Sequence, residues 1–224
     1  MSVDTPRSVH IARCRSLLRS VRLWFLGLGP TLRRGIDIAI ASTVLVLVSP
    51  ILTIAAIAIR LESKGSVLFS QLRSGLYGKP FRMWKMRSMC LDAEAQKRRL
   101  MTAGSAMRFK MRKDPRITRV GAVIRKLSID ELPQLFNVLR GDMTLIGPRP
   151  APVSECALYT PRALRRMEVL PGLTCLWQIR GRSDLSFEEQ VDLDIEYIDR
   201  ATAIQEAQIL VQTIPAVITG RGAY

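Results

Sequence analysis

One uncharged run most constrains what this chain can fold into. From Ile38 to Ile59 no residue carries a charge, and about 22 residues in a straight helix are enough to cross the ~30 Å hydrocarbon core of a bilayer. A buried helix in the core of a water-soluble protein is the alternative, but it would not need to be this long and uniformly apolar. The run therefore predicts a membrane segment, which we bound at residues 32–60.

Two features of this run argue against a simple crossing. Pro50 lies at its middle, where it deletes a backbone hydrogen bond and kinks a helix, and the hydroxyl of Ser49 can satisfy a carbonyl that the proline frees. Basic residues also flank both ends, Arg33 and Arg34 before it and Arg60 after it, whereas a crossing helix should show them mainly on one side. We therefore predict a re-entrant helix–break–helix, broken at Ser49 and Pro50, that enters one leaflet and returns.

Residues 1–31 form a basic leader ahead of this segment. Cys14–Leu28 mixes arginines with leucine, valine, tryptophan and phenylalanine, which is typical of a segment that lies on an anionic bilayer surface. A signal peptide is the alternative, but its apolar run would be short and interrupted by Gly27, Gly29 and Pro30. We predict a segment on the membrane surface.

The charge of the chain narrows its partners and its chemistry. The 224 residues include 34 Lys and Arg against 19 Asp and Glu, a formal net charge of +15, so the expected partner is nucleic acid, phospholipid or a phosphorylated substrate. His10 is the only histidine, which excludes histidine general bases and His-ligated zinc. The four cysteines form no Cys-x-x-Cys pair, as suits a reducing compartment. The chemistry must therefore rest on carboxylates, Lys and Arg, with or without a metal ion.

Beyond Leu61 the composition becomes that of a soluble domain, which we extend from residue 61 to 224. Two short strands, Val67–Phe69 and Phe81–Met86, flank the turn-forming loop Gly75–Pro80. Helical patterns follow at Leu91–Met101, Phe187–Asp199 and Ala207–Ile218.

Two adjacent acids, Asp130 and Glu131, stand out in so basic a chain. Paired carboxylates among arginines can hold a hard cation such as Mg²⁺, attack an electrophile or cap a helix. Ser128 and Glu131 match a capping box, but Pro133 would then lie beyond the first turn and crowd the helix. Pro133 fits better as the first residue of a helix Pro133–Leu139, with both carboxylates free ahead of it. Spacing alone leaves the capping and functional roles open.

Two basic features could bind phosphate. Pro148 and Pro150 restrict the backbone on both sides of Arg149, so its planar guanidinium, which suits bidentate contact with phosphate, is presented with little freedom to lose. Lys85 begins a compact basic patch, Lys85–Met89, at the end of the predicted hairpin. For such patches a solvated basic surface and phosphate or lipid-headgroup binding both remain open.

Seven short runs, taken in order, resemble the bacterial sugar transferase family, the monotopic phosphoglycosyl transferases that start the assembly of surface polysaccharides. The runs are Val48-Ser49-Pro50, Lys85–Met89, Asp114–Arg119, Ser128–Leu135, Gly141-Asp142-Met143, Gly147–Pro150 and Gly181-Arg182-Ser183. The similarity extends from about Leu32 to the C-terminus. Arg180 departs from the small polar residue expected in the family, which bears on the sugar pocket. Larger members also carry a multi-helix N-terminal region, so we expect a minimal catalytic form with a basic leader.

The resemblance implies a fold that is α with a small β component, in which the re-entrant membrane hairpin carries a cytosolic catalytic domain. The implied reaction moves a phosphosugar from a UDP-sugar to a polyprenyl (undecaprenyl) phosphate and releases UMP. It would be the first membrane step of exopolysaccharide or surface glycan synthesis. The implied location is the cytoplasmic face of the bacterial inner membrane, in contact with anionic phospholipid. Homo-oligomers are left open, and nucleic acid is not an expected partner.

The resemblance also assigns roles residue by residue. Asp130 corresponds to the nucleophile that forms an aspartyl-phosphosugar intermediate, and Glu131 to the ligand of Mg²⁺. Arg125 and Lys85 would hold phosphates, and Arg149 would contact the nucleotide diphosphate. Pro148 and Pro150, on either side of Arg149, would belong to the same substrate-binding loop.

Two other classes of protein compete with this assignment. A membrane-anchored nucleic-acid binder would be equally basic, but only 6% of the residues are aromatic and the sequence carries no RNA-binding signature. A non-catalytic membrane scaffold would use the apolar segment and the basic surface but would have no need of Asp130, Glu131 and the rigid loop at Arg149.

Overall fold

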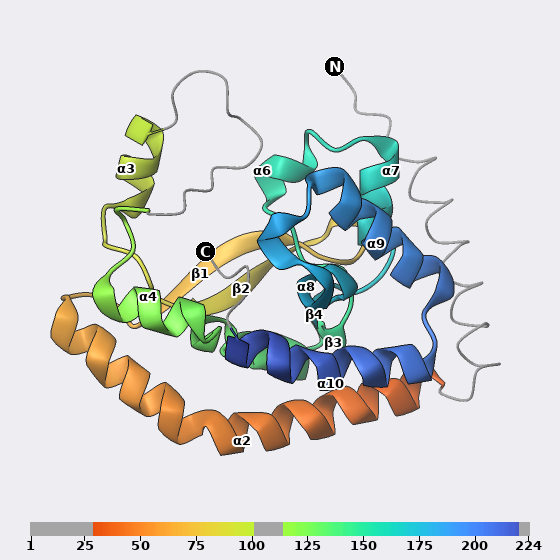
Figure 1. The fold of residues 1–224 in the computed structure, drawn as a ribbon, viewed down its shortest axis with the longest axis horizontal. Helices are drawn as coiled ribbons and strands as arrows, with labels where there is room; N and C mark the ends of the chain where they lie inside the picture. The colour runs from red at the N-terminus through yellow and green to blue at the C-terminus, as the bar shows by residue number, and fades with distance from the viewer. Residues whose placement is uncertain (1–28, 101–113, 220–224) are drawn as a thin grey trace.

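A computed structural model describes residues 29–100 and 114–219 of the chain, and it is mostly helical with a small sheet component (Figure 1). The α-helices are α2 (Pro30–Glu62), α3 (Ala93–Leu100), α4 (Arg119–Lys126), α5 (Gln134–Arg140), α6 (Val153–Cys156), α7 (Pro161–Leu164), α8 (Leu176–Arg180), α9 (Phe187–Arg200) and α10 (Ala203–Thr219). Four 3₁₀ turns are η1 (Leu76–Gly78), η2 (Ile129–Glu131), η3 (Arg165–Met167) and η4 (Arg182–Asp184). The strands are β1 (Leu68–Ser74), β2 (Pro80–Met86), β3 (Thr144–Ile146) and β4 (Gly172–Thr174). The predicted surface segment Cys14–Leu28 lies outside these residues, and the division of the chain at 31 and 60 stays a prediction.

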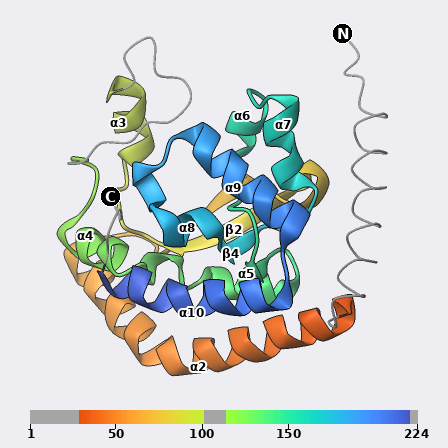
Figure 2. The same ribbon diagram turned by 45° about the vertical axis from the view of Figure 1, so that its right-hand side comes forward.

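The apolar run forms one long helix, α2, which bends near its middle and runs along one edge of the molecule beside α10 (Figures 1 and 2). It has 33 residues and contains Pro50. The expected break is therefore a bend within a continuous helix. The hydroxyl of Ser49 donates to the carbonyl of Val46 at 2.8 Å, the acceptor that Pro50 leaves without its i→i−4 donor. Because that carbonyl is satisfied locally, the helix continues through the proline.

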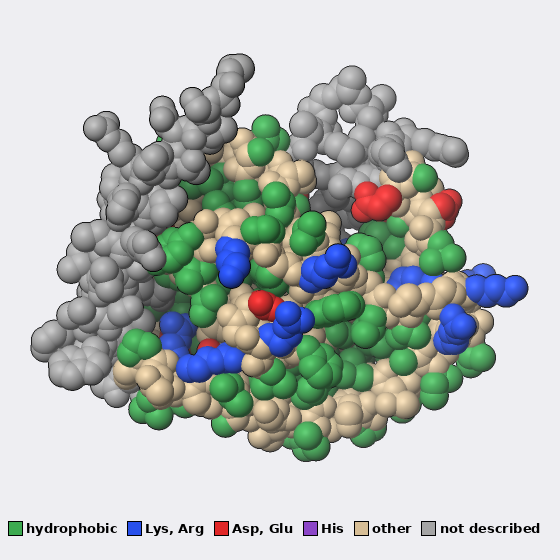
Figure 3. Space-filling model, turned by 180° about the vertical axis from the view of Figure 1, so that it is seen from behind, with side chains coloured by type: hydrophobic (Ala, Val, Ile, Leu, Met, Phe, Trp, Pro, Cys, Tyr) green, Lys and Arg blue, Asp and Glu red, His purple; other side chains and the backbone are tan. Residues whose placement is uncertain are grey.

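Most of the apolar surface of α2 is not covered by protein. Val46, Leu47 and Ile54 are about 70% exposed, at 72%, 70% and 68%. By length and composition α2 is the one helix in the described part of the chain that is able to cross a membrane. From behind, hydrophobic side chains cover much of the lower half of the molecule, while Lys and Arg side chains lie across its middle (Figure 3). This distribution suits a protein that rests against a bilayer.

The N-terminal end of α2 is fixed to the rest of the fold by polar contacts. Asp37, which is buried, accepts a hydrogen bond from the Thr144 hydroxyl on β3 at 2.6 Å. Arg34 donates to the Val138 carbonyl at the end of α5 at 2.6 Å, and Arg33 donates to a carbonyl of β3 at 3.1 Å. This end therefore lies against the body that carries β3 and α5.

The C-terminal end of α2 is fixed to the same body. The guanidinium of Arg87, just after β2, donates to the carbonyl of Ser63 at 2.8 Å. Glu62 accepts from the backbone N–H of Arg119 at 2.7 Å, so that its carboxylate satisfies a free donor at the N-terminus of α4. Both ends of the apolar helix thus contact one and the same folded unit.

The core lies between the β1–β2 hairpin, α5, α9 and α10. β1 and β2 pair antiparallel with Ser70 opposite Trp84, and the buried side chain of Asn137 on α5 holds β2 by donating to the Arg82 carbonyl at 2.7 Å and accepting from the Trp84 N–H at 3.1 Å. The largest fully buried apolar side chains are Tyr197, Met83, Leu135, Met143, Ile209 and Val138. Burial of such side chains holds the helices against the hairpin.

A second sheet is a short parallel pair, in which Thr144 of β3 lies opposite Gly172 of β4. The two strands approach so closely at this point that a Cβ on Gly172 would lie 2.0 Å from the backbone nitrogen of Gly147. Only glycine fits there. The contact fixes the segment that follows β3, the loop Gly147–Pro150, against the start of β4.

Candidate active site

Asp130 and Glu131 lie in η2, between α4 and α5. The predicted alternative, a capping box at Ser128, does not form, because Ser128 adopts φ 54° and its side chain makes no capping hydrogen bond. Pro133 is the residue just before α5 and not its first residue, a difference of one position from the prediction. Both carboxylates are thus left ahead of the helix, as the prediction for Pro133 required.

Glu131 is held between two cations from distant parts of the chain. Lys85, near the end of β2, lies 2.7 Å from Glu131 Oε1, and the guanidinium of Arg149 contacts both carboxylate oxygens, with Nη1 3.1 Å from Oε2. Burial alone would raise the pKa of Glu131, but the charges and hydrogen bonds of Arg149 and Lys85 hold it well below its ordinary range. Glu131 is therefore ionised at any physiological pH.

Asp130 is in the opposite situation. Its side chain is buried, with 6% of the residue exposed, and no residue in the described ranges donates a hydrogen bond to its carboxylate. Burial and then the charge of Glu131 raise its pKa to about 6, against the opposing charges of Lys85, Arg125 and Arg149. At neutral pH the group is mostly an anion, and its carboxylate takes no hydrogen bond from the part of the chain that the structure describes. Such a carboxylate is suited to attack an electrophile.

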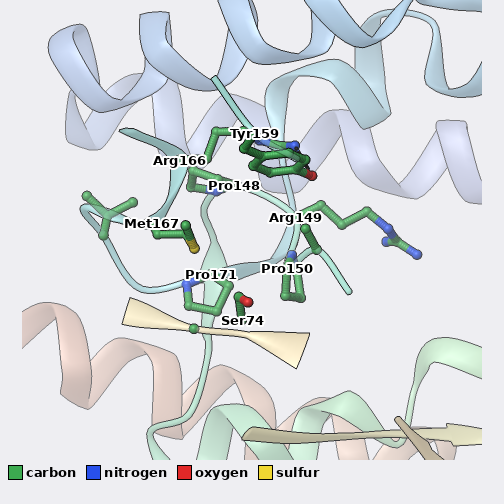
Figure 4. Close-up of a pocket in the computed structure, with 11 residues that line it drawn as sticks. Ser74, Pro148, Arg149, Pro150, Tyr159, Arg166, Met167 and Pro171 are labelled. Atoms are coloured by element: carbon green, nitrogen blue, oxygen red, sulfur yellow. Dashed lines mark hydrogen bonds between the residues drawn. The ribbon is translucent and has the colours of Figure 1, made fainter. Parts of the chain in front are cut away.

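Hydrogen bonds to its backbone hold the loop Gly147–Pro150 in place and fix the direction of the Arg149 side chain. The Pro148 carbonyl accepts from the N–H of Gly172 at 3.0 Å, and that of Pro150 accepts from Arg73 Nη1 at 3.1 Å. A cavity of about 10 Å³, the space of about one water, lies behind the loop. In Figure 4 prolines and Met167 line this cavity and the guanidinium of Arg149 extends away from it. The cavity is a packing gap, and Arg149 is aimed at Glu131.

The fold brings together most of the residues named from the sequence. Asp130, Glu131, Lys85 and Arg149 share one site, and Arg125, in the last turn of α4, acts on Asp130 through its charge. Pro148 and Pro150 shape the loop. Ser49 and Pro50 lie elsewhere, on the exposed surface of α2.

Sequence reasoning gave no role to two further arginines at this site. Arg73 on β1 supports the loop of Arg149, and burial, with the like charge of Arg149, lowers its pKa to about 10. The charge of Arg182 interacts electrostatically with the charges of Glu131 and Arg149. No pattern marks Arg73, whereas Arg182 belongs to the run Gly181-Arg182-Ser183 that had been noted for its resemblance alone.

A divalent cation at this site would depend on Glu131. No group of three Asp, Glu, His or Cys side chains converges anywhere in residues 29–100 and 114–219, so a cage built from protein alone is not available there. Mg²⁺, however, is commonly held by one or two carboxylates and completed by substrate phosphates and water. Glu131 Oε2 accepts one hydrogen bond from Arg149 and keeps a second lone pair. The residues present therefore fit a Mg²⁺ ion that Glu131 holds jointly with a phosphorylated ligand.

Comparison with known proteins gives a consistent result. The sequence model of a family described as bacterial sugar transferase matches residues 29–220. The chain is 37% identical over 204 residues to the exopolysaccharide production protein ExoY of Rhizobium meliloti, covering 88% of this chain and 90% of that protein. It is 38% identical over 200 residues to the UDP-glucose:undecaprenyl-phosphate glucose-1-phosphate transferase of Caulobacter vibrioides, covering 86% and 72%. It is 45% identical over 162 residues to the galactosyl transferase CpsE of Streptococcus agalactiae, covering 71% of this chain but only 36% of CpsE.

Proposed function

Because the chain belongs to the bacterial sugar transferase family, we propose that it transfers a sugar phosphate from a UDP-sugar to undecaprenyl phosphate, with release of UMP. The chain is an enzyme of the phosphoglycosyl transferase class, as the names of its relatives indicate. The proposed reaction is the first membrane step in the synthesis of an exopolysaccharide or surface glycan.

One observation carries the proposed mechanism. Asp130 is a buried carboxylate without a hydrogen bond from the described chain, while its neighbour Glu131 is paired with Lys85 and Arg149. The two acids are thus differentiated by their surroundings, one available for attack and the other bound to cations. A purely structural pair would be expected to be satisfied on both sides, because a buried unpaired charge is costly.

In the first step a carboxylate oxygen of Asp130 attacks the sugar-bearing phosphorus of the donor. A P–O bond to Asp130 forms, the P–O bond of the diphosphate bridge breaks, and its electron pair leaves with UMP. In the second step a phosphate oxygen of the acceptor attacks the same phosphorus, and the bond to Asp130 breaks. The carboxylate is regenerated, and the product is a polyprenyl diphosphate sugar. Two displacements of this kind predict ping-pong kinetics.

The cations of the site act on the charge that moves in both steps. Lys85 and Arg149 are free to exchange part of their interaction with Glu131 for the phosphate oxygens of the donor, since phosphoryl transfer depends mainly on positioning and charge neutralisation. Arg125 stabilises the anionic form of Asp130. When Mg²⁺ is bound, held by Glu131, it would supply further neutralisation of the diphosphate.

A lipid-soluble acceptor requires the site to lie at the membrane surface, and the two ends of α2 support this arrangement. Asp37 near its N-terminal end and Glu62 at its C-terminal end both bond to the same folded unit, whereas a straight crossing would place the ends on opposite sides of a bilayer. We therefore propose that α2 is re-entrant, bent at Pro50, and that both ends and the catalytic domain lie on the cytoplasmic face of the inner membrane. The basic flanks agree with that face.

The test is single-turnover release of UMP from a panel of UDP-sugars in the absence of lipid acceptor. The native protein should release up to one equivalent of UMP from at least one donor, and Asp130→Asn should release none. Asp192→Asn is the matched control, because Asp192 is exposed and paired with Arg162 away from the site, and it should release UMP normally. Normal release by Asp130→Asn would rule out the proposed nucleophile.

A further inference from the structure

Gln134, the first residue of α5, carries a buried amide that the mechanism described so far does not use. The residue is 1% exposed, and its Nε2 has no hydrogen-bond acceptor in the part of the chain that the structure describes. A buried donor without an acceptor is destabilising, and one recognised reason for keeping such a group is a catalytic role. A methionine of similar size would fill the same space without this cost. The fold itself therefore has no use for the amide nitrogen.

The contacts of two other residues on the same side of the helix show where Gln134 lies. Three positions before it, Glu131 pairs with Lys85 of β2, with 2.7 Å between Nζ and Oε1. Three positions after it, the side chain of Asn137 accepts from the N–H of Trp84 on the same strand at 3.1 Å. Because residues three apart are neighbours on a helix surface, all three side chains face β2. Gln134 lies in the middle of this row, next to the carboxylate that Lys85 holds.

The same geometry makes Gln134 a neighbour of Asp130. Leu132 (φ −57°, ψ −32°) and Pro133 (φ −60°, ψ −15°) both have right-handed helical backbone, so the chain keeps one helical sense from η2 into α5. Asp130 stands four positions before Gln134, a spacing at which Cβ atoms are about 5–6 Å apart and at which glutamine and aspartate form hydrogen bonds on helices. The carboxylate of Asp130 is buried and takes no hydrogen bond from the described chain. A buried donor without an acceptor thus lies one turn from a buried acceptor without a donor.

We propose that Gln134 is a positioning residue of the transfer reaction, whose amide donates to the oxygen of Asp130 that does not attack and so directs the other oxygen at the phosphorus. The assignment rests on the proposed function. The two groups are not bonded to each other in the structure, and rotation of the two side chains joins them when the sugar donor is bound.

The same hydrogen bond serves both displacements. In the first, it fixes the carboxylate while the attacking oxygen forms the P–O bond. In the aspartyl phosphate that results, the oxygen facing Gln134 has become the carbonyl oxygen. The amide continues to donate to it and stabilises the negative charge that returns to the carboxylate when the acceptor phosphate displaces it. Gln134 itself exchanges no proton and forms no bond to the substrate.

The test is Gln134→Met in single-turnover release of UMP without acceptor, with a UDP-sugar that the native protein uses. At saturating donor the rate constant should fall about 10- to 100-fold, as expected for the loss of one hydrogen bond to a charged group. The amount of UMP released and the donor concentration that gives the half-maximal rate should stay unchanged, because Gln134 acts on the nucleophile and not on the donor.

Thermal unfolding of the same variant separates this role from a structural one. The Tm of Gln134→Met should equal or exceed that of the native protein, since the substitution removes an unsatisfied buried donor. Gln190→Met is the matched control. Gln190 is also 1% exposed, but its Nε2 donates to the carbonyl of Leu185 at 2.9 Å, so its replacement should lower the Tm.

The outcomes distinguish the two levels of the account. A native rate constant in Gln134→Met overturns the positioning role and leaves the proposed function intact. A Tm below the native value, at whatever rate, shows that the amide supports the fold and also overturns the role, as does a smaller amount of UMP released at an unchanged rate. Absence of UMP release by the native protein with every UDP-sugar refutes the proposed function itself.

Discussion

Replacing the proposed nucleophile should stabilise the protein at neutral pH while abolishing transfer. Asp130 is a buried carboxylate whose charged form is disfavoured by its surroundings, with a pKa of about 6 in place of 3.8. Folding therefore has to work against its ionisation. Asp130→Asn keeps the shape of the side chain and removes that charge.

The sign and size of the effect follow from the two pKa values. A raised pKa means that folding favours the protonated carboxyl, so the stability from this group is fully present below about pH 3.8 and is lost as the pH rises through about 6. The rise of this pKa from 3.8 to about 6 corresponds to a free energy of about 3 kcal/mol. The penalty is under about 1 kcal/mol at pH 4 and is nearly complete, at about 3 kcal/mol, by pH 7.

The substitution recovers less than the whole penalty, because the buried amide of asparagine brings an unsatisfied donor of its own, which costs about 1–3 kcal/mol. That cost does not depend on pH. The free energy of unfolding of Asp130→Asn relative to the native protein should therefore rise by about 2 kcal/mol between pH 4 and pH 7. In a protein of this size 1 kcal/mol shifts Tm by about 2–4 °C.

The assay is thermal or denaturant unfolding of the purified protein in detergent at pH 4, 5, 6 and 7, with Asp192→Asn as a control. Asp192 is exposed, with 58% of its side chain accessible, so its replacement should show no comparable pH dependence. A difference between Asp130→Asn and the native protein that is the same at pH 4 and pH 7 would refute the reasoning.

Three further results are expected. The rate of single-turnover UMP release should fall as the pH drops through about 6, where Asp130 becomes protonated, and Lys85→Gln should move that midpoint upward, because a cation that favours the anion is removed; a midpoint near pH 4 in the native protein would contradict the assignment. Glu131→Gln should lower the rate and abolish most of its dependence on Mg²⁺, and an unchanged metal titration would exclude the ligand role. In intact cells the variant Ser8→Cys should resist labelling from outside at that cysteine. The further change Pro50→Ala restores the missing backbone donor and lets α2 straighten, so it should make part of the Ser8→Cys protein accessible to the label. Labelling of Ser8→Cys with Pro50 unchanged would contradict the re-entrant helix.

Local signals allowed several elements to be predicted closely. The strand Phe81–Met86 corresponds to β2, and the helix from Phe187 begins where predicted. That helix carries a capping box of Ser186 and Glu189, with both reciprocal bonds present. The similar pattern at Ser128 forms none, because Ser128 adopts a left-handed conformation. The pattern alone does not distinguish the two, because the deciding factor is the backbone that the proline and the neighbouring helix impose.

Interactions across the chain were beyond sequence reasoning. Lys85 and Arg149, which hold Glu131, lie 46 and 18 positions from it in the sequence. No local rule predicts that they contact the same carboxylate. The first strand continues to Ser74, well past the predicted Phe69, because pairing with β2 extends it. The hydroxyl of Ser49 shows the opposite case, since a contact within one helical turn was predicted and is confirmed at the Val46 carbonyl.

The covalent intermediate is the central claim, and mass spectrometry tests it most directly. The protein would be incubated with a UDP-sugar that supports UMP release, without acceptor, and its intact mass measured before peptide mapping. The account predicts an increase equal to one sugar phosphate, located on the peptide that contains Asp130 and lost when polyprenyl phosphate is added. UMP release in the absence of acceptor without any such adduct, or with the adduct on another residue, would contradict it.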